Sequence, residues 1–434
     1  MSHMSHLHDD ACRGPFAGTH GRRAFLGGGL GGLLSATSPA WQARADLAAA
    51  DRPQTRRPKS CILLWMNGGP SHLDTFDPKP DTDVAGPVKA VKTSLPDVRF
   101  SEYLPQLAER ARHLAVVRSM TTKEGNHDRG QYLMHTGYAP SATLKHPSLG
   151  AWAGHESGDR NADLPNFVSI RGPSVGAGFL GVEFNPFIVQ QPSEGVRNLP
   201  LPRDVDAARF AARREALAIA QRHFRRSAEA AVAAHDAVYA EAERMMNSPR
   251  VKAFDVAAEP TAVQRRYGEN DFGRGCLMAR RLIEAGVRFV EVTLDGWDTH
   301  YDNFTAVKNL CRVLDPAYSS LVDDLRERDR LDDVLVVWMG EFGRTPKITS
   351  VEGRDHWPAA WSAVLAGGGV RGGQVYGATD AEGAKVVADP VGTADYFATL
   401  ATLLGMDPTR EAMSPVGRPI AISDNGRPIT RLIG

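Results

Sequence analysis

The sequence predicts an α/β fold in which a mainly parallel sheet is covered by helices on both faces. Apolar runs at residues 61–66, 287–294 and 333–339 predict buried strands. Helical spacing at residues 272–285 and 304–328 leads into the second and third of these strands. Helices that alternate with fully apolar strands are typical of a parallel sheet that is buried on both sides.

The remaining pattern extends this sheet and adds one insertion. Further strands are expected at residues 114–118, 167–170 and 361–366, and further helices at 103–113, 126–136 and 395–404. The segment at about 205–250 is rich in Ala, Arg and Glu with helical periodicity, so it predicts a helical insertion, either one long helix or a hairpin. We therefore expect residues 60–434 to form a single domain.

Composition excludes some classes of partner. Lys plus Arg equals Asp plus Glu, at 51 each, so no overall charge draws the chain to nucleic acid or to an anionic membrane. Beyond the first residues no apolar run is long enough for a membrane span, so no stable membrane anchor is expected. Cys61, Cys276 and Cys311 show no paired spacing, which favours buried apolar residues over disulfides or zinc ligands.

The first residues carry an export pattern. Arg22 and Arg23 precede a weakly hydrophobic, glycine-rich stretch, and small residues at 43–45 or 38–40 offer cleavage sites. Residues 1–45 therefore predict a twin-arginine signal peptide, and 46–59 a polar linker. This predicts export by the twin-arginine translocation machinery to the periplasm or the extracellular space. The alternative is a flexible Gly/Ala tail.

Acidic and imidazole side chains follow the strands. Asp298 and His300 come directly after the strand at 287–294, and Glu341 follows the strand at 333–339. Open α/β sheets bind ligands at the carboxyl edge of their strands, so these groups are expected to converge. Carboxylate and imidazole are the ligands of a metal-assisted hydrolase site. The alternative for Asp298 and His300 is a salt bridge in a surface loop.

Two more histidines are candidate metal ligands. His356 follows Asp355, which is positioned to orient its ring, and the alternative is an ordinary turn residue. His72 lies two residues before Asp74 after the first strand, in the same alternating pattern. Arg344 is a candidate clamp for a tetrahedral oxyanion, and its alternative role is as a partner of Glu341.

A hydroxyl after the strand at 114–118 is the candidate nucleophile. Ser119, Thr121 and Thr122 all qualify, and Ser119 is preferred because it is the first hydroxyl after the strand. His127 is placed to activate it.

Several of these segments together resemble a known family. The matching segments are residues 65–80, 117–120, 131–137, 279–287, 296–300, 340–346 and 353–358. In this order they are similar to the bacterial domain-of-unknown-function family 1501, a set of exported proteins related to sulfatases. The resemblance runs from residue 60 to the C-terminus and implies an alkaline-phosphatase- or sulfatase-like fold with metal ligands at strand ends.

The resemblance also shows two departures. Asn67 stands where that superfamily usually has an aspartate ligand, and Phe342 stands where a histidine often follows the acidic ligand. Both favour one metal ion over two. The sulfatase nucleophile motif is absent, so the resemblance does not imply formylglycine chemistry.

The sequence therefore supports two functional hypotheses. The first is an exported hydrolase of phosphate or sulfate esters that uses a divalent cation, with zinc, calcium, magnesium and manganese all open. Its substrate would be a small-molecule or polysaccharide ester. The second is a non-catalytic binding or assembly protein that retains the sulfatase-like fold.

Overall fold

The computed structural model describes residues 60–434, apart from residues 173, 198 and 226–227. All of these lie in one compact unit, which spans Thr55–Gly434. The predicted signal peptide and linker lie outside the described residues. Within the described part of the chain, we find no helix with the length and apolar character needed to cross a bilayer.

A mixed sheet of eight strands forms the centre of this unit, in the order β12-β4-β11-β8-β1-β7-β5-β6. β11 runs antiparallel to both of its neighbours, and every other neighbouring pair is parallel. The predicted mainly parallel α/β sheet is confirmed. The strands are β1 (Ser60–Asn67), β4 (Leu114–Met120), β5 (Phe167–Ile170), β6 (Phe187–Val189), β7 (Phe289–Asp295), β8 (Val334–Met339), β11 (Trp361–Ala366) and β12 (Gln374–Tyr376).

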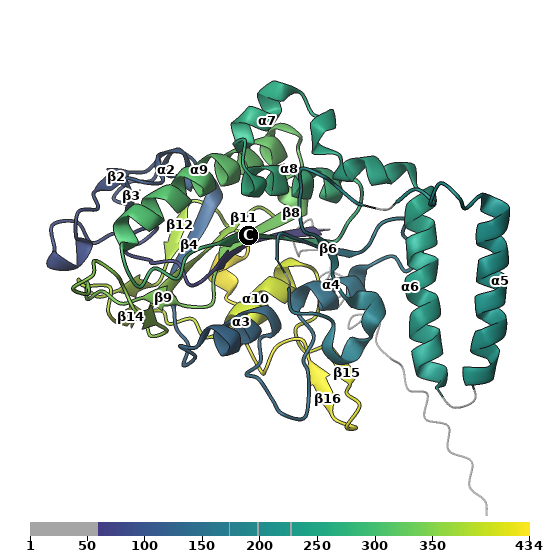
Figure 1. Cartoon of the computed structure of the whole chain (residues 1–434). Helices are drawn as coiled ribbons and strands as arrows, with labels where there is room; N and C mark the ends of the chain where they lie inside the picture. The colour runs from purple at the N-terminus through teal and green to yellow at the C-terminus, as the bar shows by residue number, and fades with distance from the viewer. Residues whose placement is uncertain (1–59, 173, 198, 226–227) are drawn as a thin grey trace, which may run out of the picture. The chain divides into compact units, whose positions relative to one another are not determined.

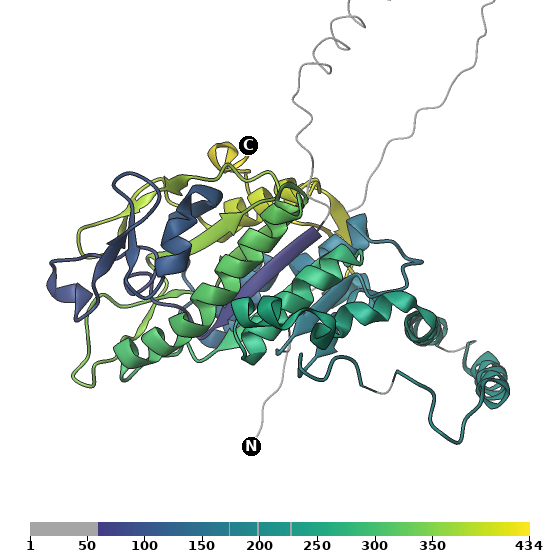
Figure 2. The ribbon, with the colours of Figure 1, turned by 90° about the horizontal axis from the view of Figure 1, so that it is seen from above.

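Helices cover both faces of the sheet (Figures 1 and 2). One face carries α2 (Pro105–Glu109), α7 (Thr261–Tyr267), α8 (Asp271–Glu284) and α9 (Asn303–Glu327). The other carries α3 (His127–Thr136), α4 (Leu149–Ser157) and α10 (Thr393–Leu403). The predicted helix at 103–113 is divided into α2 and a turn of 3-10 helix at Ala111–His113. Asp315 of α9 caps the start of α2 by accepting the N–H groups of Gln106 and Leu107.

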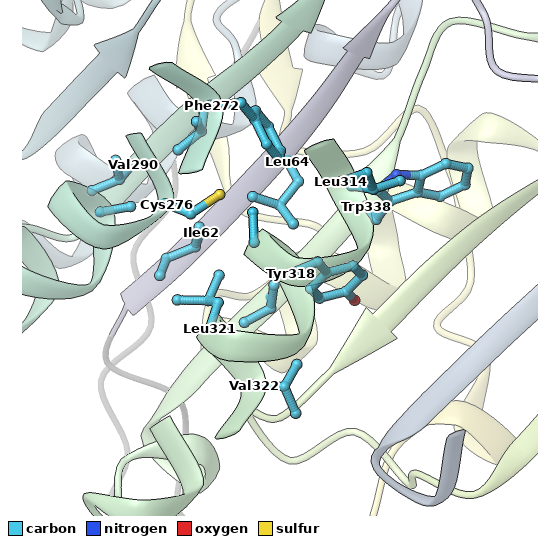
Figure 3. Close-up of a cluster of buried hydrophobic side chains, with 14 of the residues drawn as sticks. Ile62, Leu64, Phe272, Cys276, Val290, Leu314, Tyr318, Leu321, Val322 and Trp338 are labelled. Carbon is cyan, nitrogen blue, oxygen red and sulfur yellow. The ribbon is translucent and has the colours of Figure 1, made fainter. Parts of the chain in front are cut away.

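Alternating side chains of β1 explain why both faces of the sheet are buried. Ile62 and Leu64 pack against Cys276, Leu314 and Tyr318 on the face shown in Figure 3. The intervening residues of β1 belong to a second apolar cluster on the opposite face. Successive strand residues point to opposite faces, so a strand that is apolar at every position requires cover on both sides.

The insertion consists of two helices, α5 (Ala207–Phe224) and α6 (Glu229–Asn247), which lie side by side in Figure 1. Arg225 of the turn region pairs with Asp236 at 2.8 Å, and Gln221 contacts His235 at 2.9 Å. Of the two sequence alternatives, the hairpin is therefore correct.

The described residues also form four short two-stranded sheets: β2 (Ala90–Lys92) with β3 (Arg99–Ser101), β9 (Gly343–Arg344) with β10 (His356–Trp357), β13 (Ala378–Thr379) with β14 (Val386–Ala388), and β15 (Glu411–Met413) with β16 (Pro419–Ala421).

Burial predicts how two identical substitutions differ. Val290 of β7 is 0% exposed, whereas Val416, in a turn, is 55% exposed. We expect Val290→Ala to lower the free energy of unfolding by about 2 kcal/mol, because it removes buried methyl groups and leaves a cavity. Val416→Ala should change it by less than about 0.5 kcal/mol. Denaturant unfolding of both variants checks this, and equal effects would contradict the assigned core.

Candidate metal centre

The loops at the carboxyl edge of the sheet meet beyond the ends of β1, β7 and β8. The N–H of Trp297 donates to the carbonyl of Asn67 at 3.1 Å, which joins the loops after β7 and β1. Gly68 has φ +117°, and a Cβ there would lie 2.4 Å from the amide nitrogen of Asp298. Only glycine fits both the conformation and the contact, so the sequence at residue 68 allows Asp298 to approach the end of β1.

A small hairpin brings the last histidine to the same place. His356 of β10 pairs with Arg344 of β9 across an antiparallel ladder. The segment between them passes close to the loop after β7, where a Cβ on Gly353 would lie 1.7 Å from the carbonyl oxygen of His300. These two close approaches set His300 and His356 side by side, with their Nε2 atoms 3.0 Å apart.

Three imidazoles converge on one carboxylate oxygen. Oδ1 of Asp298 lies 3.2 Å from Nε2 of His127, 3.1 Å from Nε2 of His300 and 3.3 Å from Nε2 of His356. Within the described residues, His127, Asp298 and His356 form a group whose ligand atoms all lie within 4.8 Å of one another. Ligands held at roughly 2.1 Å around one tetrahedral cation lie about 3.4 Å apart, which is close to these separations.

The other ring nitrogen of each histidine already has an acceptor. Nδ1 of His127 lies 2.8 Å from Oε1 of Glu341, and Nδ1 of His300 lies 2.9 Å from Oδ1 of Asp355. Nδ1 of His356 lies 2.7 Å from the carbonyl oxygen of Gly125. In a neutral ring this contact places the proton on Nδ1, so each Nε2 presents a lone pair to the shared space.

A buried arginine fixes the carboxylate. The Arg344 side chain is 0% exposed, and its Nη2 donates to Oδ1 of Asp298 at 2.5 Å and also to the carbonyl of Gly68. Nε donates to the carbonyl of Gly69 at 3.0 Å, and Nη1 to that of Arg354 at 3.1 Å. With all three nitrogens engaged, the guanidinium holds Asp298 in place and has no surface to offer a substrate.

Charge and burial set the protonation of the cluster. Burial alone would raise the pKa of Asp298, but the hydrogen bond and charge of Arg344 lower that pKa to about 2. The hydrogen bond that the His127 ring donates to Glu341 raises the pKa of His127. Burial lowers the pKa of His356. Nε2 of His127 is buried and has no hydrogen-bond partner, since its contact with Asp298 lacks suitable geometry.

Of the predicted metal ligands, Asp298, His300 and His356 are brought together, while Glu341 and His72 take other positions. Glu341 is 1% exposed and reaches the cluster through His127, and its Oε1 also accepts the N–H of Gly68 at 2.9 Å. The ring of His72 is fully buried and its Nε2 contacts the carbonyl of Gly383 at 2.8 Å. It faces away because the turn after β1 packs inward at this residue.

The predicted nucleophile and its base are also separated. The hydroxyl of Ser119 is buried and donates to the carbonyl of Asp389 at 2.7 Å, beside β14. His127, expected beside it, lies instead among the converging rings. Sequence spacing alone missed this, although Asn126 marks the start of α3 by accepting the N–H of Arg129.

Comparison with known proteins identifies the family. The profile of the family described as "Protein of unknown function (DUF1501)" matches residues 58–433, so the chain belongs to that family. No curated protein matches the sequence.

Among solved structures, the chain is similar to the lipoteichoic acid synthase LtaP of Listeria monocytogenes, at 10% identity and a TM-score of 0.38 over 86% of this chain and 78% of that one. It is similar to the PsFucS1 sulfatase of a Pseudoalteromonas species, at 14% identity and a TM-score of 0.36 over 85% of this chain and 71% of that one. It is also similar to an alkaline phosphatase superfamily protein of Vibrio parahaemolyticus, at 12% identity and a TM-score of 0.37 over 87% of this chain and 71% of that one.

A second buried ion pair supports the loops of the cluster. Arg354 and Asp74 are both 0% exposed, and Nε of Arg354 lies 2.8 Å from Oδ2 of Asp74. The same carboxylate accepts the side-chain amide of Asn303 at 2.9 Å, at the start of α9. Nη1 and Nη2 of Arg354 donate to the carbonyls of Thr345, Pro346 and Val84. This pair therefore joins the loops that carry His300 and His356 to the loop after β1.

We expect Arg354→Met to lower the free energy of unfolding by roughly 3–5 kcal/mol, because it leaves the Asp74 carboxylate buried without its counter-charge. The matched control is Arg410→Met, since Arg410 is 62% exposed and pairs with Glu156 at 3.4 Å. The control should cost less than about 1 kcal/mol. Thermal or urea unfolding distinguishes the two, and a neutral Arg354→Met would contradict the structural role.

Proposed function

We propose that this member of the DUF1501 family is a metal-dependent hydrolase of phosphate or sulfate esters. The observation that carries the proposal is the convergence of three imidazole Nε2 atoms on Oδ1 of Asp298, each ring with its Nδ1 committed to an acceptor. When the three rings are neutral, their Nε2 lone pairs face one shared space, and no proton lies between them. A divalent cation resolves that arrangement. We also propose that residues 1–45 export the protein by the twin-arginine route.

The residues fit a cation of the zinc type. We assign His127, Asp298 and His356 as its ligands, since Nε2 of His127 is buried without any hydrogen-bond partner. Imidazole with one carboxylate suits zinc or manganese, whereas calcium and magnesium prefer an all-oxygen set. The sequence left zinc, calcium, magnesium and manganese open, and the nitrogen-rich set of ligands favours zinc and manganese.

The remaining groups supply orientation and proton transfer. A bound cation would polarise an ester oxygen and favour attack on phosphorus or sulfur. Glu341 and the Gly125 carbonyl hold the rings of His127 and His356 in place. Among the described residues, no hydrogen bond of Asp298 or of the three rings involves a hydroxyl or thiol side chain, so we propose water as the nucleophile in place of Ser119.

His300 is the proposed general base. Its side chain is 33% exposed, and Asp355, at 2.9 Å from Nδ1, can stabilise the imidazolium that forms when Nε2 takes the proton from water. We prefer a proton-transfer role over the ligand role that the sequence predicted for His300, because the group of ligand atoms that lie within 4.8 Å of one another consists of His127, Asp298 and His356. Arg344 keeps Asp298 ionised and correctly turned.

The alternative function is a binding protein that retains the fold without turnover. It is favoured by the two departures from the superfamily pattern. Asn67 donates its amide to Asp295 at 2.9 Å and supplies no charge to the cluster, and the ring of Phe342 packs 5.1 Å from that of His127 and 4.6 Å from that of His356. These positions leave one cation as the only charge that polarises a substrate.

Metal content is the first test. Wild-type protein that is stripped with a chelator and then dialysed against zinc or manganese should hold about one ion per chain. We expect His356→Ala and Asp298→Asn to lower the metal affinity by at least roughly 10–100-fold, because each removes a direct ligand. His113→Ala, a half-buried histidine remote from the cluster, is the matched control and should bind as wild type. Wild-type protein that binds neither ion would sink the metal proposal.

Turnover is the second test and separates ligands from base. Both His300→Ala and Asp355→Asn should retain the metal. Loss of the general base in His300→Ala should lower kcat for aryl phosphate or aryl sulfate hydrolysis by roughly 10²–10⁴-fold. Loss of its orienting partner in Asp355→Asn should lower kcat by a smaller factor. Loss of metal in His300→Ala would instead make it a ligand. Stoichiometric metal with no ester turnover in the wild-type protein would favour the binding function.

A further inference from the structure

A cavity of about 410 Å³ opens beside the proposed metal centre, over the ends of β1, β5 and β7. Asp298 and His127 form one of its walls, so an ester held at the cluster would place its alcohol part here. Nothing in the proposed chemistry explains the side chains on the other walls. Their role rests on the proposed function, since it concerns the alcohol part of the same ester.

The floor of the cavity is a connected row of polar groups. The amide of Asn67 donates to Oδ1 of Asp295 at 2.9 Å and accepts from the amide of Gln131 at 3.2 Å. Trp65 donates its indole N–H to the same Asn67 oxygen at 3.4 Å. These bonds fix the row on three elements, β1, β7 and α3. Among the described residues, Oδ2 of Asp295 and Oε1 of Gln131 have no protein partner, so they remain as acceptors.

The opposite wall supplies donors and one unpaired hydroxyl. Arg171 follows β5 directly and has φ +72°, a conformation that is uncommon for a residue other than glycine and is often found at functional sites. Its Nη1 donates to Asp271 at 2.6 Å, while its Nε has no partner in the described structure. Thr293 is 4% exposed, and its hydroxyl is likewise unpartnered.

Polar and apolar atoms contribute about equally to the exposed surface of the cavity, and large apolar side chains supply little of the apolar part. Trp65 is the one large apolar side chain that lines it, and Trp65 is 1% exposed because it lies beneath the Asn67 row. Gly68, Gly172 and Gly296 supply backbone only. An aryl or alkyl alcohol would therefore bury polar groups here without giving them partners, which costs free energy for each group left unpaired.

We infer that the cavity is a subsite for a polyhydroxylated, sugar-type alcohol. Paired amides and carboxylates with free oxygens accept hydroxyl protons, while Arg171 donates to hydroxyl or ring oxygens. An ammonium alcohol is the competing ligand, because Asp128 lines the cavity together with Asp295 and Asp298. The unpartnered Nε of Arg171, and the lack of an exposed aromatic face among the described lining residues, favour the hydroxylated alcohol. Asp295, Asn67 and Gln131 are thereby specificity-determining residues.

The test compares esters of three alcohols on the metal-loaded full chain. The probes are a hexose monophosphate, ethanolamine phosphate and p-nitrophenyl phosphate, together with the hexose and p-nitrophenyl sulfates. We expect the hexose ester to have the highest kcat/KM. In Asp295→Asn, the ratio of its kcat/KM to that of the p-nitrophenyl ester should fall about 10-fold, chiefly through KM, since one charged hydrogen bond is weakened. Asp332→Asn, in the turn before the amino end of β8, should leave the ratio unchanged.

Each other outcome counts against the inference. A preference for the aryl ester that Asp295→Asn does not shift overturns it, and so does a preference for ethanolamine phosphate. If no ester is hydrolysed, the proposed function fails, and equilibrium binding of the same hexose monophosphate then judges the subsite alone. Binding that weakens at least about 5-fold in Asp295→Asn supports the subsite, and the absence of binding overturns it.

Discussion

The buried guanidinium of Arg344 is the contact on which the geometry of the site depends. It joins the carbonyls of Gly68 and Gly69 after β1, the carbonyl of Arg354 before β10, and the carboxylate of Asp298 after β7. A planar fork with its nitrogens engaged has little freedom to tilt, and any acceptor that moves leaves a buried charge poorly solvated. Three loops from distant parts of the chain are therefore held to one another, and Oδ1 of Asp298 is fixed relative to all of them.

Around that fixed oxygen, carboxylates outnumber guanidinium groups. Asp298, Glu341 and Asp355 are three carboxylates, and Arg344 is the one guanidinium in contact with them in the described structure. Protonated imidazoles could supply positive charge unequally, because the hydrogen bond with Glu341 raises the pKa of His127 whereas burial lowers the pKa of His356. The rings are held by two carboxylates and one backbone carbonyl from different loops, so their common orientation does not follow from any single interaction. The cation that we propose would bind Nε2 of His127 and of His356, and would leave Nε2 of His300 free to accept a proton.

The sequence predicted the sheet well because long apolar strands and helical spacing leave clear patterns. It missed β6 and β12, which have three residues each and are too short for periodicity to register. It predicted that Asp298, His300 and His356 converge, as they do, because they directly follow strands or turns at the carboxyl edge of the sheet. It misplaced Ser119, since a position after a strand does not reveal that β11 and β8 lie between β4 and β1, nor that a carbonyl from residue 389 takes the hydroxyl. The place of His127 depends on the length of a loop, which spacing cannot convert into a distance.

Asn67 links the number of cations to the character of the cavity. Its amide nitrogen lies 2.9 Å from Oδ1 of Asp295, so an aspartate at residue 67 would set two carboxylates about 3 Å apart. Like charges at that separation require a proton or a second cation between them. The amide removes that requirement, and it turns the end of β1 from a ligand position into part of a hydrogen-bonded row with Gln131. We propose that the amide at residue 67 has two consequences: it favours a single cation beside Asp298, and it joins Asp295 and Gln131 into the polar floor of the cavity.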